Sequence, residues 1–158
     1  MKLLRDILYK ANLQEVHGST NTAITSITFD SRKVGKDSLF VAVKGANSDG
    51  HAFIDKAIEL GAIAIVCEIL PELLNPKISY VRVADSAEAL GCMAANYYDH
   101  PSESLRLIGV TGTNGKTTTV TLLFQLFRAI GIKAGMFTTV RNMVNNDEIP
   151  ATHTTPDA

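Results

Sequence analysis

The residues best suited to chemistry in this sequence lie at positions 112–118 and read Gly-Thr-Asn-Gly-Lys-Thr-Thr. Gly112 and Gly115 allow a tight turn that brings backbone N–H groups close to phosphate oxygens. The Lys116 ammonium can reach the β- and γ-phosphates of a nucleotide, and the Thr117 hydroxyl can ligate Mg²⁺. The pattern predicts a phosphate-binding loop made of Gly112, Thr113, Asn114, Gly115, Lys116, Thr117 and Thr118.

The flanks of this loop also have the pattern that phosphate binding requires. Residues 105–110 are mostly apolar and predict a buried strand. Residues 119–130 have apolar side chains at helical spacing, and the N-terminus of the predicted helix adds partial positive charge near the phosphates. Val110 stands where the general motif has its first glycine. A chance Gly/Thr-rich turn is the alternative, and both flanks argue against it.

Composition and charge describe an ordinary globular protein. The chain is 46% hydrophobic and 20% charged, with a net charge of −1, which favours neither a nucleic-acid nor a membrane partner. Because the sequence shows neither a signal pattern nor an apolar run that could span a bilayer, we expect a cytoplasmic location. Cys67 and Cys92 lie in apolar surroundings, so we expect free thiols in place of a disulfide.

The first hundred residues alternate between strand and helix patterns. Strands are expected at 24–29, 38–43, 62–67 and 78–83, and helices at 3–8, at 53–58 and after Asp85. Asp85 and Glu88 have the spacing of a capping box. The alternation predicts an α/β fold with a largely parallel sheet.

A polar segment at 99–104 contains a proline and predicts a boundary between two domains, residues 1–101 and 102–158. In the second domain a strand is expected at 133–140 and a polar loop at 141–149. Thr155 followed by Pro156 is typical of a helix start. A second domain of about fifty residues is too small for a doubly wound core, so we expect a piece of a longer protein.

The loop at 112–118 resembles the nucleotide loop of the Mur ligases, ATP-dependent amide ligases of peptidoglycan precursor synthesis, which share its departure from the general motif. The rest of the chain resembles the same family in several segments. These are Asp30-Ser31-Arg32, Gly35, residues 37–42, Gly45 with Asp49-Gly50, residues 98–102 and residues 154–157. Their order and spacing make the resemblance specific.

The resemblance implies three domains: an N-terminal α/β UDP-substrate-binding domain, a doubly wound P-loop ATPase domain, and a C-terminal domain for the incoming amino acid. This chain would contain the first domain and the start of the second. The segments point to the members that add the third amino acid, diaminopimelate or lysine, to UDP-N-acetylmuramoyl-L-alanyl-D-glutamate. In the implied reaction ATP converts the glutamate side chain to an acyl phosphate, which the amino group attacks. We expect the fragment alone to be inactive.

The resemblance also assigns roles to individual residues. Substrate contacts would come from Phe29, Ser31, Ala46, Asn47, Ser48, His153, Thr154 and Thr155. Ser31 would contact the UDP part, residues 46–48 the uracil, and the two threonines the diphosphate-sugar region. Lys116 would be catalytic, because with Mg²⁺ it would stabilise charge on the transferred phosphoryl group.

Each assignment has a plainer alternative. Ser31 could be a turn residue that bonds to its own backbone, Thr154 and Thr155 could only cap a helix, and His153 could lie exposed in a loop. At the level of the whole chain, a non-catalytic module that binds a UDP-sugar or a nucleotide is one alternative. A sister ligase that adds the D-alanyl-D-alanine dipeptide is another. A small-molecule kinase fits the loop but leaves the first domain unexplained.

Overall fold

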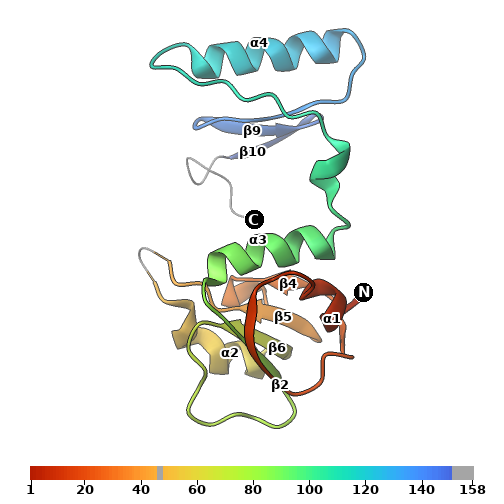
Figure 1. Ribbon diagram of the computed structural model, residues 1–158. Helices are drawn as coiled ribbons and strands as arrows, with labels where there is room; N and C mark the ends of the chain where they lie inside the picture. The colour runs from red at the N-terminus through yellow and green to blue at the C-terminus, as the bar shows by residue number, and fades with distance from the viewer. Residues whose placement is uncertain (46–47, 151–158) are drawn as a thin grey trace. The chain divides into compact units, whose positions relative to one another are not determined.

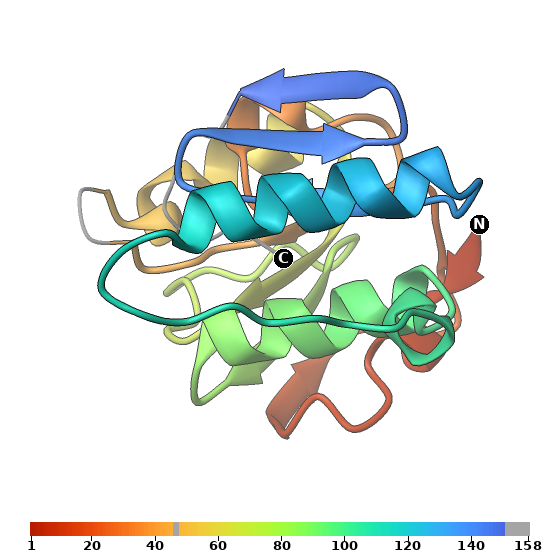
Figure 2. The ribbon, with the colours of Figure 1, turned by 90° about the horizontal axis from the view of Figure 1, so that it is seen from above.

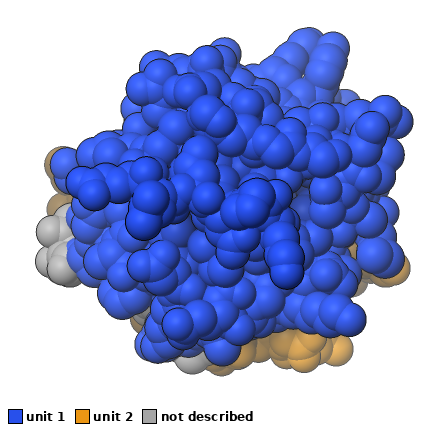
Figure 3. Space-filling model, turned by 90° about the horizontal axis from the view of Figure 1, so that it is seen from below, with its two compact units in different colours: residues 1–105 blue, residues 106–158 orange. Residues whose placement is uncertain are grey.

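The computed structural model describes residues 1–45 and 48–150 of the 158-residue chain. It divides into two compact units, Met1–Leu105 and Arg106–Ala158, which are coloured separately in Figure 3. The predicted domain boundary, between residues 101 and 102, falls at a short 3₁₀ helix, η3 (Pro101–Ser104). Each unit is described by itself below.

A five-stranded sheet with the order β2-β7-β6-β5-β4 forms the centre of the first unit (Figure 1). Its strands are β2 (Leu13–His17), β4 (Ile27–Thr28), β5 (Ser38–Val41), β6 (Ala62–Cys67) and β7 (Ser79–Val83). Strands β4 to β7 run parallel, and β2 pairs antiparallel with β7. This confirms the predicted α/β fold with a largely parallel sheet. The sequence prediction missed β2, whose side chains are mostly exposed at the edge of the sheet.

Helices cover both faces of this sheet. They are α1 (Leu4–Ile7), α2 (Ile54–Glu59) and α3 (Ser86–Tyr97), as predicted. Because side chains alternate along a strand, β6 contributes to two cores. Ala64 and Val66 pack with residues of α1 and α3, whereas Ile65 and Cys67 pack with residues of α2. A strand buried on both faces reads as a continuous apolar run, which explains why the sequence predicted β6 well.

Asp85 begins α3 as the predicted cap. Its Oδ1 accepts hydrogen bonds from the N–H groups of Ala87 and Glu88, each at 2.9 Å. Glu88 does not return the second bond of a capping box, because its Oε1 accepts from the Asn12 side chain at 3.5 Å. Half of the predicted capping box is therefore present.

The predicted strand at 24–29 is broken into two short strands. β3 (Ala23–Ile24) pairs antiparallel with β1 (Lys2–Leu3) in a separate two-stranded sheet, while β4 joins the main sheet. The chain leaves the first sheet at Thr25, whose N–H donates to the carbonyl of Asp37 at 3.0 Å. The apolar pattern predicted the strand conformation but contains no information about the change of partner.

The second unit contains α4 (Lys116–Ala129) and a three-stranded antiparallel sheet. The strands are β8 (Gly135–Phe137), β9 (Arg141–Val144) and β10 (Asp147–Pro150). The helix predicted at 119–130 is confirmed, with an earlier start at Lys116. The strand predicted at 133–140 is shorter than expected. Figure 2 shows the two arrows of β9 and β10 running in opposite directions beside α4.

The polar loop predicted at 141–149 is wrong, because this segment forms the β9–β10 hairpin. Asn145 lies at the turn with φ of 55°. Asparagine adopts this left-handed conformation more readily than most residues and is typical of tight hairpin turns. The Asn145-Asn146 pair was thus the signal for a hairpin, and polarity alone was misleading.

The buried strand predicted at 105–110 is also wrong. Residues 106–111 have no regular structure, and Leu107 is 94% exposed. A strand needs a neighbour to accept and donate its backbone hydrogen bonds. No other strand in the described part of the second unit pairs with this segment.

Both cysteines are free thiols, as predicted. Cys67 is fully buried, and its burial raises the pKa of the thiol to about 11. Within residues 1–45 and 48–150, the structure contains no helix with the length and apolar character that a membrane span requires.

Candidate functional site

The loop before α4 has the backbone conformation that phosphate binding requires. Gly112 and Gly115 have φ values of 146° and 79°, which side-chain-bearing residues rarely adopt. Gly115 is the N-cap of α4 and no side chain caps this helix end. The first N–H groups of an uncapped helix are available to an anion, and the helix dipole favours negative charge there.

Lys116 lies across this loop. Its Nζ donates hydrogen bonds to the carbonyl oxygens of Gly112 and of Thr113, the latter at 3.2 Å. The ammonium group is therefore held next to the backbone that would contact phosphate. The residues of the loop are exposed apart from half-buried Thr117. The structure places the residues predicted for phosphate binding in the turn before α4 and in the first turn of that helix: Gly112, Thr113, Asn114, Gly115, Lys116, Thr117 and Thr118.

The chemistry of this loop fits a polyphosphate with Mg²⁺. It offers backbone N–H donors and one ammonium, which match phosphate oxygens. Magnesium keeps several waters and takes few protein ligands besides substrate phosphates, so a single hydroxyl such as that of Thr117 is a typical contribution. The described residues contain no cluster of three or more His, Cys, Asp or Glu that would hold a metal without the phosphates.

In the first unit, two predicted substrate segments begin at the same edge of the sheet. β4 and β5 are neighbouring parallel strands, so the segments that follow them both leave from their carboxyl ends. One segment contains Phe29 and Ser31, and the other contains Ser48. This edge is where open α/β sheets bind their ligands. Phe29 is 39% exposed, and Ser31 is buried at the start of the 3₁₀ helix η1 (Ser31–Lys33).

The turn at Ser31 is capped by its neighbour. Asp30 Oδ1 accepts from the N–H of Arg32 at 3.0 Å, and the Arg32 guanidinium donates to both oxygens of Asp30 at 2.9 and 2.8 Å. These bonds lower the pKa of Asp30 to about 2. Among the described residues, the Ser31 hydroxyl has no hydrogen-bond partner. The substrate contact assigned to Ser31 stays a prediction.

After β5, the described residues on either side of residues 46–47 are bonded to each other. Lys44 and Asp49 form an antiparallel bridge, and the N–H of Gly45 donates to the carbonyl of Ser48 at 3.0 Å. Ser48 is exposed. Gly50 follows in close contact with the end of β5, since an added Cβ would lie 2.7 Å from the backbone N and O of Val43. Predicted substrate residues Ala46, Asn47, His153, Thr154 and Thr155 lie outside the described residues.

His51 makes two side-chain contacts that the sequence analysis did not predict. Its Nδ1 lies 2.6 Å from Asp49 Oδ1, and its Nε2 lies 3.0 Å from the backbone N of Glu68. The Asp49-Gly50-His51 run was a visible signal for the first contact. The second contact joins residues far apart in sequence and could not be inferred from spacing.

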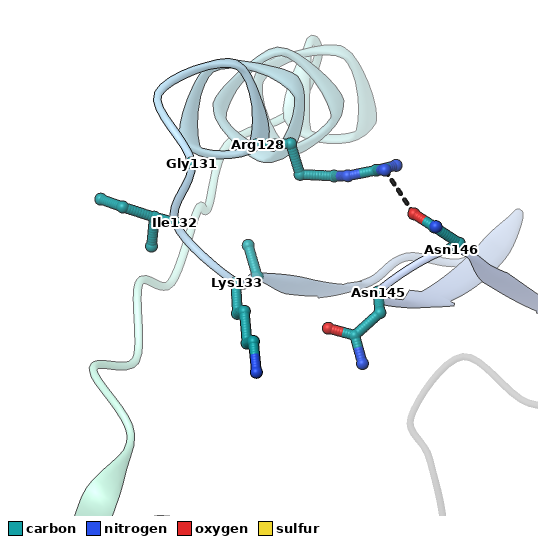
Figure 4. A pocket seen from close by; sticks show the side chains of 7 residues that line it. Arg128, Gly131, Ile132, Lys133, Asn145 and Asn146 are labelled. Atoms are coloured by element: carbon teal, nitrogen blue, oxygen red, sulfur yellow. Dashed lines mark hydrogen bonds between the residues drawn. The ribbon is translucent and has the colours of Figure 1, made fainter.

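A shallow hollow lies at the other end of α4 from the glycine loop (Figure 4). It is lined by Arg128, Gly131, Ile132, Lys133, Ala134, Asn145 and Asn146. Arg128 spans part of it and donates a hydrogen bond to Asn146 Oδ1. This hollow contains none of the residues that the sequence predicted for ligand binding.

Comparison with protein families matches both units. Residues 23–98 match the Mur ligase family, catalytic domain, and residues 110–158 match the Mur ligase middle domain. The chain belongs to the Mur ligase family. The middle-domain match includes the glycine loop, and the catalytic-domain match includes Ser31 and the turn at 44–49.

Two curated relatives of this chain carry the same protein name. The chain is 54% identical over 156 residues to UDP-N-acetylmuramoyl-L-alanyl-D-glutamate–2,6-diaminopimelate ligase of Cytophaga hutchinsonii, covering 98% of this chain and 32% of the relative. It is 51% identical to the ligase of the same name from Parabacteroides distasonis, with the same coverage. The chain therefore spans about a third of the length of the curated relatives it matches.

Solved Mur ligase structures share the fold. A UDP-N-acetylmuramoyl-L-alanyl-D-glutamate–2,6-diaminopimelate ligase has a TM-score of 0.71 at 23% identity, covering 99% of this chain and 31% of that chain. MurF from Acinetobacter baumannii has a TM-score of 0.63 at 27% identity, covering 81% of this chain and 28% of that one. MurF from Thermotoga maritima in complex with ADP has a TM-score of 0.52 at 32% identity, covering 72% and 25%.

Proposed function

We propose that this Mur ligase chain provides the UDP-substrate-binding unit and the ATP-binding loop of a ligase that adds the third amino acid to UDP-N-acetylmuramoyl-L-alanyl-D-glutamate. The observation that carries the proposal is the uncapped, glycine-bounded start of α4 with Lys116 held across it. The names and the 54% and 51% identities of the curated relatives support the substrate and favour diaminopimelate over lysine as the amino acid.

In the second domain, which we propose comprises residues 102–158, the glycine loop binds the phosphates of ATP. The backbone N–H groups around Gly112 and Gly115 contact phosphate oxygens, and Lys116 turns from the loop carbonyls to the transferred phosphoryl group. Mg²⁺, when bound with ATP, compensates phosphate charge. The Thr117 hydroxyl is the ligand that this chain supplies to it.

In the first domain, which we propose comprises residues 1–101, the carboxyl edge of the sheet binds the UDP part of the substrate. Phe29 and the unpaired Ser31 hydroxyl lie at the end of β4, and Ser48 lies in the turn after β5. Ala46, Asn47, His153, Thr154 and Thr155 complete the proposed substrate contacts by resemblance. Because the proposed substrates, ATP and a UDP-sugar, are cytoplasmic metabolites, we place the reaction in the cytoplasm.

The sister-ligase alternative receives less support. The curated relatives that match 98% of this chain at 54% and 51% identity are named as diaminopimelate-adding ligases and not as the ligase that adds the dipeptide. The non-catalytic alternative makes a different prediction, since it requires binding without turnover in any longer form of the protein.

Calorimetric titration of the 158-residue chain tests the proposal. We expect separate binding of UDP-N-acetylmuramoyl-L-alanyl-D-glutamate and of ATP with Mg²⁺. Ser31→Ala should weaken only the muramoyl dipeptide, with Ser102→Ala as the control at an exposed serine. Lys116→Ala should weaken only ATP, with Lys133→Ala as the control at an exposed lysine of the same unit. Binding of ATP without the muramoyl dipeptide or UDP would contradict the assignment of the first unit.

A further inference from the structure

The last turn of α3 is anchored to the N-terminal part of the chain. Asn96 is buried, and its side-chain amide donates to the carbonyl oxygens of Ile7 at 2.8 Å and of Tyr9 at 2.6 Å. The Tyr97 hydroxyl donates to the carbonyl of Thr25. Breaking such buried bonds would leave polar groups without partners, so the end of α3 has a fixed position in the first unit.

Lys2 adds a charged contact at the same helix end. Its Nζ donates to the carbonyl of Asn96 and to Asp99 Oδ1, the second at 2.5 Å. The Lys2 side chain is 26% exposed, whereas that of Asp99 is 83% exposed. Because the carboxylate lies in solvent, salt or a substitution can weaken this ion pair without disturbing the core. Lys2 therefore forms a removable contact between β1 and the chain that leaves α3.

The chain leaves α3 in a costly backbone conformation. Asp99 and His100 have φ values of 63° and 52°, so two successive residues with side chains are left-handed. Glycine is the usual residue at such a position after a helix, because a Cβ makes the conformation unfavourable. Within residues 1–45 and 48–150, no other two successive residues with side chains share this conformation.

His100 has one clear alternative to the left-handed conformation. Pro101 follows it and begins η3. A proline disfavours the right-handed helical conformation for the residue before it, so the alternative for His100 is extended backbone. The left-handed state is held by the hydrogen bond from the His100 N–H to the Ala95 carbonyl at 2.8 Å. Strained residues of this kind persist only where their surroundings hold them, and they are typical of switch regions.

We propose that Asp99 and His100 form a hinge between the two units and that Lys2 is the latch that holds it in the left-handed state. When the ion pair to Asp99 opens, His100 can become extended, which redirects the chain after Pro101 while the anchored end of α3 stays in place. Because the two proposed substrates bind to different units, the latch controls how freely the units reorient. This consequence rests on the proposed function, whereas the hinge itself does not.

Hydrogen exchange at the amide of residue 100 tests the latch in the whole 158-residue chain. Lys2→Met keeps the aliphatic stem and removes the charge, so it should accelerate this exchange about fivefold, the size expected for an exposed ion pair. Lys77→Met is the matched control, since Lys77 is exposed before β7. Salt at about 0.5 M should accelerate exchange in the wild type and not in Lys2→Met.

A second variant tests the strain separately from the latch. His100→Gly leaves Lys2 and Asp99 in place and removes the cost of a left-handed Cβ, so exchange at residue 100 should become slower than in the wild type. The lost ring makes no hydrogen bond within the described residues, since its Nδ1 lies 3.9 Å from Glu103. Faster exchange in His100→Gly would show that the left-handed pair stores no strain and would overturn the hinge.

Nitrogen-15 relaxation separates a hinge from a simple helix end. Lys2→Met should increase the difference between the rotational correlation times of the two units, and Lys77→Met should not. Faster exchange at residue 100 with unchanged correlation times would assign Lys2 to the helix end alone and would refute the hinge. Unchanged exchange in a folded Lys2→Met variant would refute the latch. A chain that binds neither UDP nor ATP would contradict the proposed function and leave the hinge untouched.

Discussion

The Glu68 carboxylate accepts two hydrogen bonds from Ser86, one from its backbone N–H and one from its hydroxyl. The pair joins the end of β6 to the first residue of α3, where the helix dipole also favours a negative charge. The contact between Glu68 and Ser86 therefore holds the carboxyl end of β6 against α3. This end of the sheet is where the first unit is proposed to bind its substrate.

This pair predicts a pH-dependent contribution to stability. The hydrogen bonds from Ser86 lower the pKa of Glu68 below its ordinary value of 4.5. Because the folded-state pKa is the lower one, the stabilisation is present above pH 4.5 and is lost as the pH falls through the folded pKa. Ser86→Ala should cost about 1 kcal/mol at pH 7. Urea unfolding at pH 7 and pH 3 should show a smaller difference for this variant than for the wild type.

The Asp30–Arg32 pair predicts an unusually acidic carboxyl group. Asp30 should titrate at about pH 2, so its stabilising charge persists until the pH falls below its ordinary value of 3.8 and is lost toward pH 2. Carbon-detected NMR titration of Asp30 measures this directly. Arg32→Ala should move the titration back toward the ordinary value, while Lys33→Ala should leave it nearly unchanged. A wild-type Asp30 that titrates near pH 3.8 would contradict the prediction.

Gly115 should be required for its conformation and not for lack of space. An added Cβ at Gly115 meets no atom within 4 Å, yet φ is 79°. Gly115→Ala should therefore cost about 1–2 kcal/mol in the left-handed conformation and should weaken ATP binding. Gly109→Ala is the control, since its Cβ also meets no atom and its φ is not positive. Equal ATP affinities for the two variants, measured by calorimetry, would refute this explanation.

Substitution of two apolar residues of α4 should change the stability of the chain by very different amounts. Phe124 is 7% exposed on α4, which contacts β8, whereas Leu126 on the same helix is 55% exposed. Phe124→Ala should destabilise the chain by about 3 kcal/mol, and Leu126→Ala should change stability little. Leu126→Lys should also reduce concentration-dependent association, because Leu122, Leu126 and Ile130 form an exposed apolar row. Thermal unfolding and sedimentation velocity provide the two measurements.

The sequence predicted most elements of the first unit because burial and periodicity coincide there. β6 is apolar at every position and α3 starts at an aspartate, so each could be recognised without its neighbours. The segment 105–110 is mostly apolar but forms no strand, because strand formation depends on a partner that local sequence does not reveal. The hairpin at 141–150 failed for the converse reason, since its polar side chains concealed a pairing that Asn145 permits.

The candidate sites divide in the same way. The glycine loop could be recognised because its chemistry is carried by consecutive residues, whereas the hydrogen bond from Lys116 to the carbonyl of Thr113 was not predicted. The contact between His51 and Glu68 was not predictable, because the donor is a backbone N–H of a residue 17 positions away, just after β6. Ser31 lies between these cases: its position after a strand was visible in the sequence, but the bonds between Asp30 and Arg32 that form the turn around it were not predicted.

The burial of Cys67 gives the first unit an intrinsic probe of local opening. Its thiol lies at the end of β6 with no exposed surface and a pKa of about 11, so a thiol reagent at neutral pH meets neither an accessible sulfur nor a thiolate. Cys92 on α3 is half-buried and should react first. Cys67 should be labelled more slowly, because labelling requires β6 to open locally. The labelling rate of Cys67 therefore measures how often the end of this central strand opens, without any engineered label.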